Sequence, residues 1–425
     1  MGAAEGFFGG QAAAALARGI PIQWCFCTPY LLMWTLNTPA ITNFRVSYGA
    51  CAAGRAASSS GRVSLWVLPA FTCLTFPPPH TQISADFYYG GSWEIGTTSL
   101  LVMAMGKAPS KDTFWSSNNG AQATTRGGCD KTGCPADHST PAAELHTALA
   151  VLSTGPVGFS DAPNETDATL LMRTCDSAGN LLQPSRPITS VDSTQSAVAA
   201  EQPKGRVLCT HTAIAPSSSS SSVAVAAAGP APVEAALYIV LGHQLTQDYT
   251  LLLRDLWPAP ATPAVLTVAG SLNALRACSA GSAAAACGLA QLPLAPGAPS
   301  TTPLLTLPMV PAGVDAFTPH LAMLARTCPG SSPGAGLGFL GEAEKFAPVS
   351  VQRFLALDCT VQGSGEAELQ LTLAGQPGES VALTWVQWQG AAQGTVRTGV
   401  HQFPGAAKGL QQVDCTVAGD SLTCA

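Results

Sequence analysis

The spacing of apolar residues changes near residue 190, and this change limits the folds that the chain can adopt. Before it, helix-like stretches at residues 6–19 and 29–36 alternate with short apolar runs at 20–26 and 40–46. Such alternation of helix and buried strand is typical of an α/β barrel or a doubly wound sheet. After a break, the order returns, with helices expected at 93–105 and 141–152 and strands at 112–116 and 154–160.

Beyond residue 190 the pattern predicts an all-β domain. Short alternating or apolar runs stand between turn residues, as in a β-sandwich, at 235–241, 249–253, 265–268, 349–357, 368–373 and 381–387. Low-complexity stretches rich in Ala, Ser and Pro interrupt them, and we expect disordered loops at 217–222, 280–286 and 293–303. The sequence therefore predicts one domain over residues 1–195 and a β-sandwich over 196–425.

Composition excludes several classes of protein. Hydrophobic residues make up 47% of the chain and charged residues 10%, so it is not a disordered charged tail. The net charge of -6 comes with no clustered basic run, so we expect no nucleic-acid partner. No apolar run reaches the roughly 18 residues that a membrane span needs. We expect no cofactor and no metal.

Fourteen cysteines favour disulfides over free thiols. Zinc is the alternative at Cys129 and Cys134, with Asp137 and His138 nearby, but the spacing differs from a C-x-x-C pair and no second pair follows closely. The cysteines and a sequon at Asn164 indicate that the complete protein is secreted or extracellular. Residues 1–10 lack the pattern of a signal peptide, so we expect an additional N-terminal region to precede this chain.

Four groups of motifs occur in a specific order along residues 6–46 and 83–195. They are Ile22-Gln-Trp-Cys25; Asn43-Phe-Arg45 continued by residues 83–87; Trp93-Glu-Ile-Gly96 with residues 111–115; and Glu144-Leu-His146 with residues 153–161. Together they resemble the second half of the barrel in the α-galactosidase and raffinose-synthase-like glycosidases. The resemblance implies an α/β plus all-β fold, with about strands 5–8 of a (β/α)8 TIM barrel followed by a β-sandwich.

The resemblance also implies a catalytic acid/base. Retaining glycosidases use two carboxylates about 5 Å apart, and barrel enzymes carry them at the carboxyl ends of strands. In the family, the acid/base Asp ends the sixth strand, four residues after an Arg. Here Arg45 has no carboxylate so close, but removing residues 46–82 places Asp86 four residues after it. Asp86 is thus the candidate acid/base, with a solvated strand-end residue as the alternative, and residues 46–82 are a low-complexity insertion or a retained intron.

Four residues are candidates for sugar binding by the same resemblance. Arg45 anchors the sixth strand, and Asp112 and Trp115 lie where the seventh strand should face the pocket. Trp115 would stack on a sugar ring, or else be an ordinary core aromatic. Asp161 ends the eighth strand and would bind sugar hydroxyls, or else cap the next turn.

The expected partner is an oligosaccharide or glycoside substrate, which the complete protein would cleave or transfer as an α-galactoside or a related sugar. The family's nucleophile ends the fourth strand, and no Lys-x-Asp at the end of an apolar run precedes residue 20. We therefore expect this chain to be an inactive fragment of a glycosidase. The alternatives are a non-catalytic carbohydrate-binding or structural protein and a gene-model fragment without a function of its own.

Overall fold

A computed structural model gives the fold of the chain. The chain forms two compact units, one of Met1–Leu170 with Pro187–Thr189 and one of Leu171–Arg186 with Ser190–Ala425. The structure describes residues 10–20, 22–24, 41–46, 99, 102–104, 106–111, 114, 116–117, 143–159, 161, 163–199, 205–216, 235–243, 245–260, 264–309, 320–405 and 409–425. The insertion and retained-intron hypothesis, from residue 47 onward, lies outside them, as does the zinc alternative at Cys129 and Cys134.

The first unit contains a parallel sheet. Its strands are β1 (Ile22–Trp24), β2 (Ile41–Val46) and β3 (Ala108–Lys111), which pair in that order. A parallel bridge joins Phe114 to Phe159. The described residues of this unit show these parallel segments and no closed barrel.

Two strand predictions in this unit need correction. The strand that pairs with β2 is β3, which precedes the expected range 112–116, and its residues Ser110 and Lys111 are buried although they are polar. Of that range the structure describes Phe114, which forms a bridge, and Ser116. The strand expected at 154–160 is reduced to the bridge at Phe159. Gly155 lies so close to the backbone of β3 that an added β-carbon would overlap the carbonyl oxygen of Pro109.

The helix α6 (Ala143–Leu152) lies within the range expected for it. Every residue of α6 except Glu144 is buried. Seven of the ten residues of α6 are Ala, Leu or Val, and a helix so largely apolar belongs inside a protein. Near the N-terminus, residues 10–16 are helical and the chain turns away at Gly19, whose φ of 65° suits a residue without a β-carbon.

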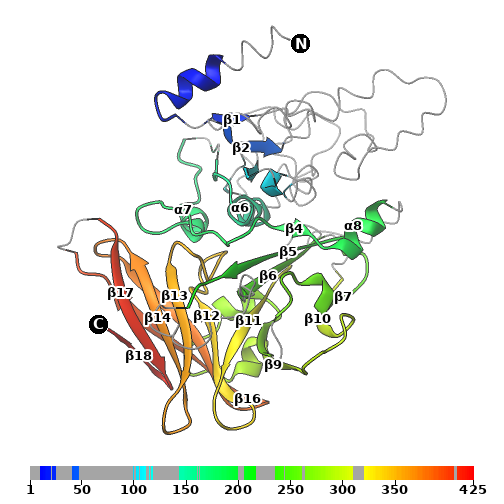
Figure 1. Ribbon diagram of the computed structural model, residues 1–425, viewed down its shortest axis with the longest axis vertical. Helices are drawn as coiled ribbons and strands as arrows, with labels where there is room; N and C mark the ends of the chain where they lie inside the picture. The colour runs from blue at the N-terminus through cyan, green and yellow to red at the C-terminus, as the bar shows by residue number, and fades with distance from the viewer. Residues whose placement is uncertain are drawn as a thin grey trace, which may run out of the picture. The chain divides into compact units, whose positions relative to one another are not determined.

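The second unit is mostly β, with antiparallel sheets as in a β-sandwich. A nine-stranded sheet runs β16-β15-β12-β11-β6-β5-β4, with β8 paired to β11 and β9 paired to β8. A four-stranded sheet runs β13-β14-β17-β18, and β10 pairs with β7. Figure 1 shows the four-stranded sheet, orange to red, as a layer beside β11 and β12.

The remaining elements have the following bounds. The strands are β4 (Thr189–Ser190), β5 (Arg206–Ala213), β6 (Ala235–His243), β7 (Tyr249–Leu252), β8 (Ala264–Ala269), β9 (Leu289–Leu294), β10 (Pro303–Leu307), β11 (His320–Pro329), β12 (Ala335–Gly341), β13 (Phe354–Val361), β14 (Ala367–Gly375), β15 (Ser380–Gly390), β16 (Gln393–Gln402), β17 (Gln411–Ala418) and β18 (Ser421–Cys424). The helices are α7 (Ala168–Leu171), η4 (Met172–Thr174), α8 (Asp192–Ala199), η6 (Leu253–Asp255), α9 (Leu272–Arg276) and η7 (Ala284–Cys287).

Alternation of side chains explains how the two sheets face each other. Along β14, Leu369, Leu371 and Leu373 are buried, whereas the residues between them are more exposed. Successive side chains of a strand point to opposite faces, so this spacing directs one face of β14 into the core. Across the core, the rings of Phe339 on β12 and Phe354 on β13 meet edge to face, with centroids 5.3 Å apart.

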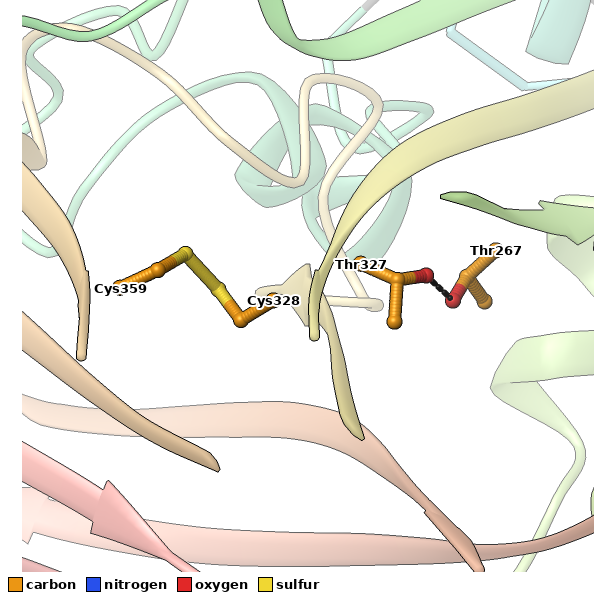
Figure 2. Close-up of a disulfide and its surroundings, with 4 residues drawn as sticks. All are labelled: Thr267, Thr327, Cys328 and Cys359. Carbon is orange, nitrogen blue, oxygen red and sulfur yellow. Dashed lines mark hydrogen bonds between the residues drawn. A yellow bond between two sulfur atoms is a disulfide. The ribbon is translucent and has the colours of Figure 1, made fainter. Parts of the chain in front are cut away.

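A disulfide also joins the two sheets. Cys328 on β11 is bonded to Cys359 on β13. Figure 2 shows this bond beside the hydroxyl groups of Thr267 and Thr327, which lie 2.7 Å apart in a hydrogen bond. Two further disulfides, Cys278–Cys287 and Cys415–Cys424, lie among the described residues. Three disulfides are typical of a protein from an oxidising, extracellular environment.

The low-complexity stretches are more ordered than expected. Residues 280–286 contain most of η7, next to the Cys278–Cys287 disulfide, and the stretch 293–303 begins in β9 and ends in β10. The composition of these stretches predicted disorder, but a disulfide and pairing with neighbouring strands hold their residues in place. The expected strand at 349–357 starts later, at Phe354, and residues 217–222 lie outside the described part of the chain.

The structure also describes the sequon and the helices that were considered as membrane spans. The sequon residue Asn164 is exposed, with a φ of 68° in a turn. Within the described ranges, no helix combines the length and apolar character needed to cross a membrane.

Candidate functional site

Three of the five residues predicted for a site lie outside the described residues. These are Asp86, Asp112 and Trp115. Arg45 lies near the carboxyl end of β2, where it pairs with Ser110 of β3. Asp161 follows the bridge at Phe159 by two residues, so it also comes at the carboxyl end of a parallel segment.

Asp161 is held by a serine that the sequence did not single out. The backbone N–H of Ser116 donates to Asp161 Oδ1 at 2.8 Å, and the Ser116 hydroxyl donates to Oδ2 at 2.6 Å. The backbone N–H of Asp167 donates in turn to the Ser116 hydroxyl oxygen at 2.8 Å. Ser116 is buried and Asp161 is half-buried, so the carboxylate has a fixed orientation and one partly exposed side.

The segment that precedes Ser116 is hydrogen-bonded to the segment that precedes Asp161. Phe114 is fully buried, and its backbone N–H donates to Gly158 O at 3.3 Å. The Phe114 ring stacks on His146 of α6, with centroids 6.3 Å apart. The ammonium group of Lys111, at the end of β3, lies 5.4 Å from the centroid of the same ring. A buried cation at this edge is a second feature that the sequence did not predict.

Asp167 caps the N-terminus of the next helix, α7. Asp167 Oδ1 accepts a hydrogen bond from the backbone N–H of Leu170 at 2.9 Å. Both oxygens of Asp161, for which capping was the alternative role, accept hydrogen bonds from Ser116.

The second unit carries an exposed tryptophan, Trp257, that packs against Arg186 and the buried His211, and these three residues are here called the Trp257 platform. Trp257 is 66% exposed. The Arg186 guanidinium lies 4.2 Å from the centroid of its ring, and the His211 ring meets it edge on, with centroids 6.0 Å apart. These neighbours hold the indole in place, while most of its surface stays open to solvent.

Electrostatics keep the platform's histidine neutral. Burial, and then the positive charge of Arg186, lower the pKa of His211 from 6.5 to about 4. Burial also lowers the pKa of Arg186 from its ordinary value. The platform therefore combines one cation with a neutral imidazole beside an aromatic ring. No local sequence pattern predicts the platform, because Trp257 stands in a bend and its partners are distant along the chain.

Comparison with known proteins does not assign the chain to a family. No protein-family model and no curated protein matches this chain. The resemblance to glycosidases therefore rests on the sequence motifs described above alone.

Proposed function

We propose that the complete protein is a glycoside hydrolase-like enzyme that cleaves or transfers α-galactosides or related sugars by a retaining mechanism. One observation carries the proposal: β1, β2 and β3 pair in parallel and in chain order, and a parallel bridge joins the segments that follow. Neighbouring strands of a (β/α)8 barrel are arranged in this way. The finer assignment, strands 5–8 of such a barrel ahead of a β-sandwich, is part of the proposal.

The polar residues support it by their place on the strands. Arg45 comes near the end of β2, Lys111 ends β3, and Ser116 and Asp161 follow the bridge. The carboxyl ends of parallel strands lie on one edge of a sheet, and barrel enzymes bind and transform their substrates at that edge. In this proposal Asp161, oriented by Ser116, accepts hydrogen bonds from sugar hydroxyls.

Asp86 is the proposed acid/base, and Arg45, Asp112 and Trp115 are further sugar contacts. Double displacement also needs a carboxylate nucleophile across the sugar ring. None of the 425 residues is assigned that role, so we propose that this chain alone does not hydrolyse glycosides.

The test uses protein translated from the complete transcript. Replacing Asp86→Ala should lower turnover of a natural oligosaccharide by about 10²–10⁴-fold, because an alkoxide leaving group needs a proton. The glycosylation step with a nitrophenyl glycoside should fall much less, and azide should speed breakdown of the intermediate. Asp161→Ala is the control, since loss of a hydroxyl contact should weaken both substrates alike. Equal losses in Asp86→Ala without azide rescue would contradict the acid/base role, and a complete protein inert on every glycoside would contradict the function.

A second candidate is carbohydrate binding without catalysis, which the Trp257 platform favours. An exposed indole offers a flat apolar face to the C–H face of a sugar, and the adjacent Arg186 guanidinium can donate to its hydroxyls. Titration calorimetry of this chain against oligosaccharides should show binding that Trp257→Ala abolishes. Leu410→Ala, which removes a different exposed apolar side chain, should have no effect. Binding that survives Trp257→Ala would exclude the platform.

A further inference from the structure

Three side chains that bind metals in many proteins converge at the edge of the second unit. His401 lies on β16, Cys415 on β17 and Cys424 on β18. One nitrogen of the imidazole and the two sulfur atoms all lie within 4.8 Å of one another. Among the described residues, this is the group of His, Cys, Asp and Glu side chains whose spacing suits a metal ion.

The group forms because two sheet edges approach closely. β16 ends the path of the nine-stranded sheet and β18 ends that of the four-stranded sheet. Gly399, two residues before His401 and so on the same face of β16, lies against Leu422 of β18. A β-carbon at Gly399 would be only 2.7 Å from the Leu422 β-carbon. The glycine therefore permits the approach that brings His401 to the cysteine pair.

The cysteines are joined in this structure. Cys415 and Cys424 are directly opposite each other across the β17–β18 pair, and their sulfur atoms form a disulfide. A disulfide sulfur is a poor metal ligand, whereas a thiolate is a strong one. Breaking the disulfide would leave two thiols beside the imidazole without requiring the strands to separate.

His401 has a buried nitrogen atom that is suited to bind a metal ion. Its Nε2 atom is buried and has no hydrogen-bond partner. The ring packs edge on against Phe403, with centroids 4.6 Å apart, which limits its rotation. A neutral imidazole nitrogen without a hydrogen-bond partner has a lone pair to offer a metal. A buried polar atom without a hydrogen-bond partner destabilises the folded protein, so its presence calls for an explanation.

We propose that reduction of the Cys415–Cys424 disulfide creates a binding site for Zn²⁺ or a similar divalent ion, with His401, Cys415 and Cys424 as its ligands. A dithiol reductant supplies two electrons and two protons, which convert the disulfide to two thiols while the dithiol closes to its own disulfide. The metal then displaces one proton from each thiol. The two states exclude each other, because the same sulfur atoms serve either the disulfide or the metal.

The ligand set fits the chemistry of zinc. Zinc binds thiolate sulfur at about 2.3 Å and imidazole nitrogen at about 2.0–2.1 Å in a tetrahedral arrangement. The three ligand atoms lie within 4.8 Å of one another, close enough to share one ion. Three protein ligands leave a fourth position for water, and Cys424 and His401 are only half-buried, so solvent reaches the site. In the reduced protein the metal would tie the two sheet edges together in place of the disulfide.

The chain offers a matched control for the experiment. The Cys278–Cys287 disulfide closes a loop of the same sequence separation, 9 residues, as Cys415–Cys424. No described histidine joins it in a metal-binding group. Its thiols, once reduced, should therefore show what ordinary cysteines do in the presence of zinc.

The test is zinc-dependent protection of identified thiols. The chain is reduced with a phosphine, which offers no thiolates, and is alkylated with iodoacetamide with and without Zn²⁺ before peptide mapping. Zinc should slow alkylation of Cys415 and Cys424 by at least about tenfold, the scale on which metal-site substitutions act. Cys278 and Cys287 should react at the same rate in both conditions.

The variant His401→Gln tests whether the imidazole is a zinc ligand. It keeps both cysteines and the disulfide, so the protein folds as the wild type does under oxidising conditions, which near-ultraviolet circular dichroism checks. We expect it to lose the zinc protection. Equal alkylation of the Cys415–Cys424 pair with and without zinc in the wild type would overturn the site, as would equal protection of both cysteine pairs. Unchanged protection in His401→Gln would exclude the histidine as a ligand.

Discussion

Replacing Arg353→Met should destabilise the second unit by about 3–5 kcal/mol, the usual cost of removing one partner from a buried ion pair. The Arg353 side chain is only 2% exposed and lies between two glutamates that are nearly as buried. Its Nε donates to Glu342 at 2.7 Å, and its two terminal nitrogens donate to Glu379 at 2.9 and 2.6 Å. A further bond of 2.7 Å reaches Ala374 O. Methionine fills much of the volume but leaves both carboxylates without their cation.

The effect should depend on pH, which separates it from a loss of packing. Burial alone would raise the pKa of Glu379, but the hydrogen bonds from Arg353 hold it below its ordinary value. This carboxylate therefore stabilises the folded state at pH values above its unfolded pKa, and that contribution is lost as the pH falls through its folded pKa. Burial raises the pKa of Glu342, whose contribution has the opposite sign. Without Arg353 both carboxyl groups bind protons more readily, so the destabilisation should be largest near pH 7 and smaller near pH 5.

Urea unfolding followed by tryptophan fluorescence measures the difference. The control is Arg276→Met, which breaks an exposed pair with Glu344, 3.1 Å long and with the glutamate 66% exposed. That change should cost about 1 kcal/mol or less. Adding Glu342→Gln and Glu379→Gln to Arg353→Met should restore part of the lost stability. A loss below 1 kcal/mol, or one that does not change between pH 7 and pH 5, would refute the reasoning.

Three other perturbations test the packing, the covalent links and the titration of the second unit. Gly338→Ala should cost about 1–3 kcal/mol in urea unfolding, because its β-carbon would overlap buried side chains of β8 and β15, whereas Gly390→Ala, with open space around it, should stay within about 0.5 kcal/mol. Replacing both Cys328 and Cys359 with alanine should lower the free energy of unfolding by about 2–4 kcal/mol, and a variant as stable as the wild type would contradict a structural disulfide. The pKa of His211 is 6.5 in an unfolded chain and about 4 in the folded protein, so the unfolded state binds more protons between these values and stability should fall as the pH is lowered through them. His211→Gln should flatten that part of the profile, and an imidazole that titrates near pH 6.5 by NMR would contradict the assignment.

The local pattern of apolar residues was enough to predict several helices and strands. The apolar run at 40–46 became β2, the Ala- and Leu-rich stretch near residue 145 became α6, and the spaced leucines of β14 became one buried face. In each case the period of the apolar residues is a property of neighbouring side chains, so the sequence alone carries it. The number of cysteines likewise indicated disulfides, without their pairing.

Tertiary structure alone decided which distant groups meet. The partner of Asp161 is Ser116, 45 residues away, and Arg353 binds a glutamate 26 residues away. Neither pair leaves a periodic signal, because the choice of partner depends on how strands cross in space. The same applies to His401 and the cysteine pair, which come together only because two sheets fold edge against edge. Burial then sets the charge and reactivity of these groups, and burial is a property of the packed chain that no local pattern encodes.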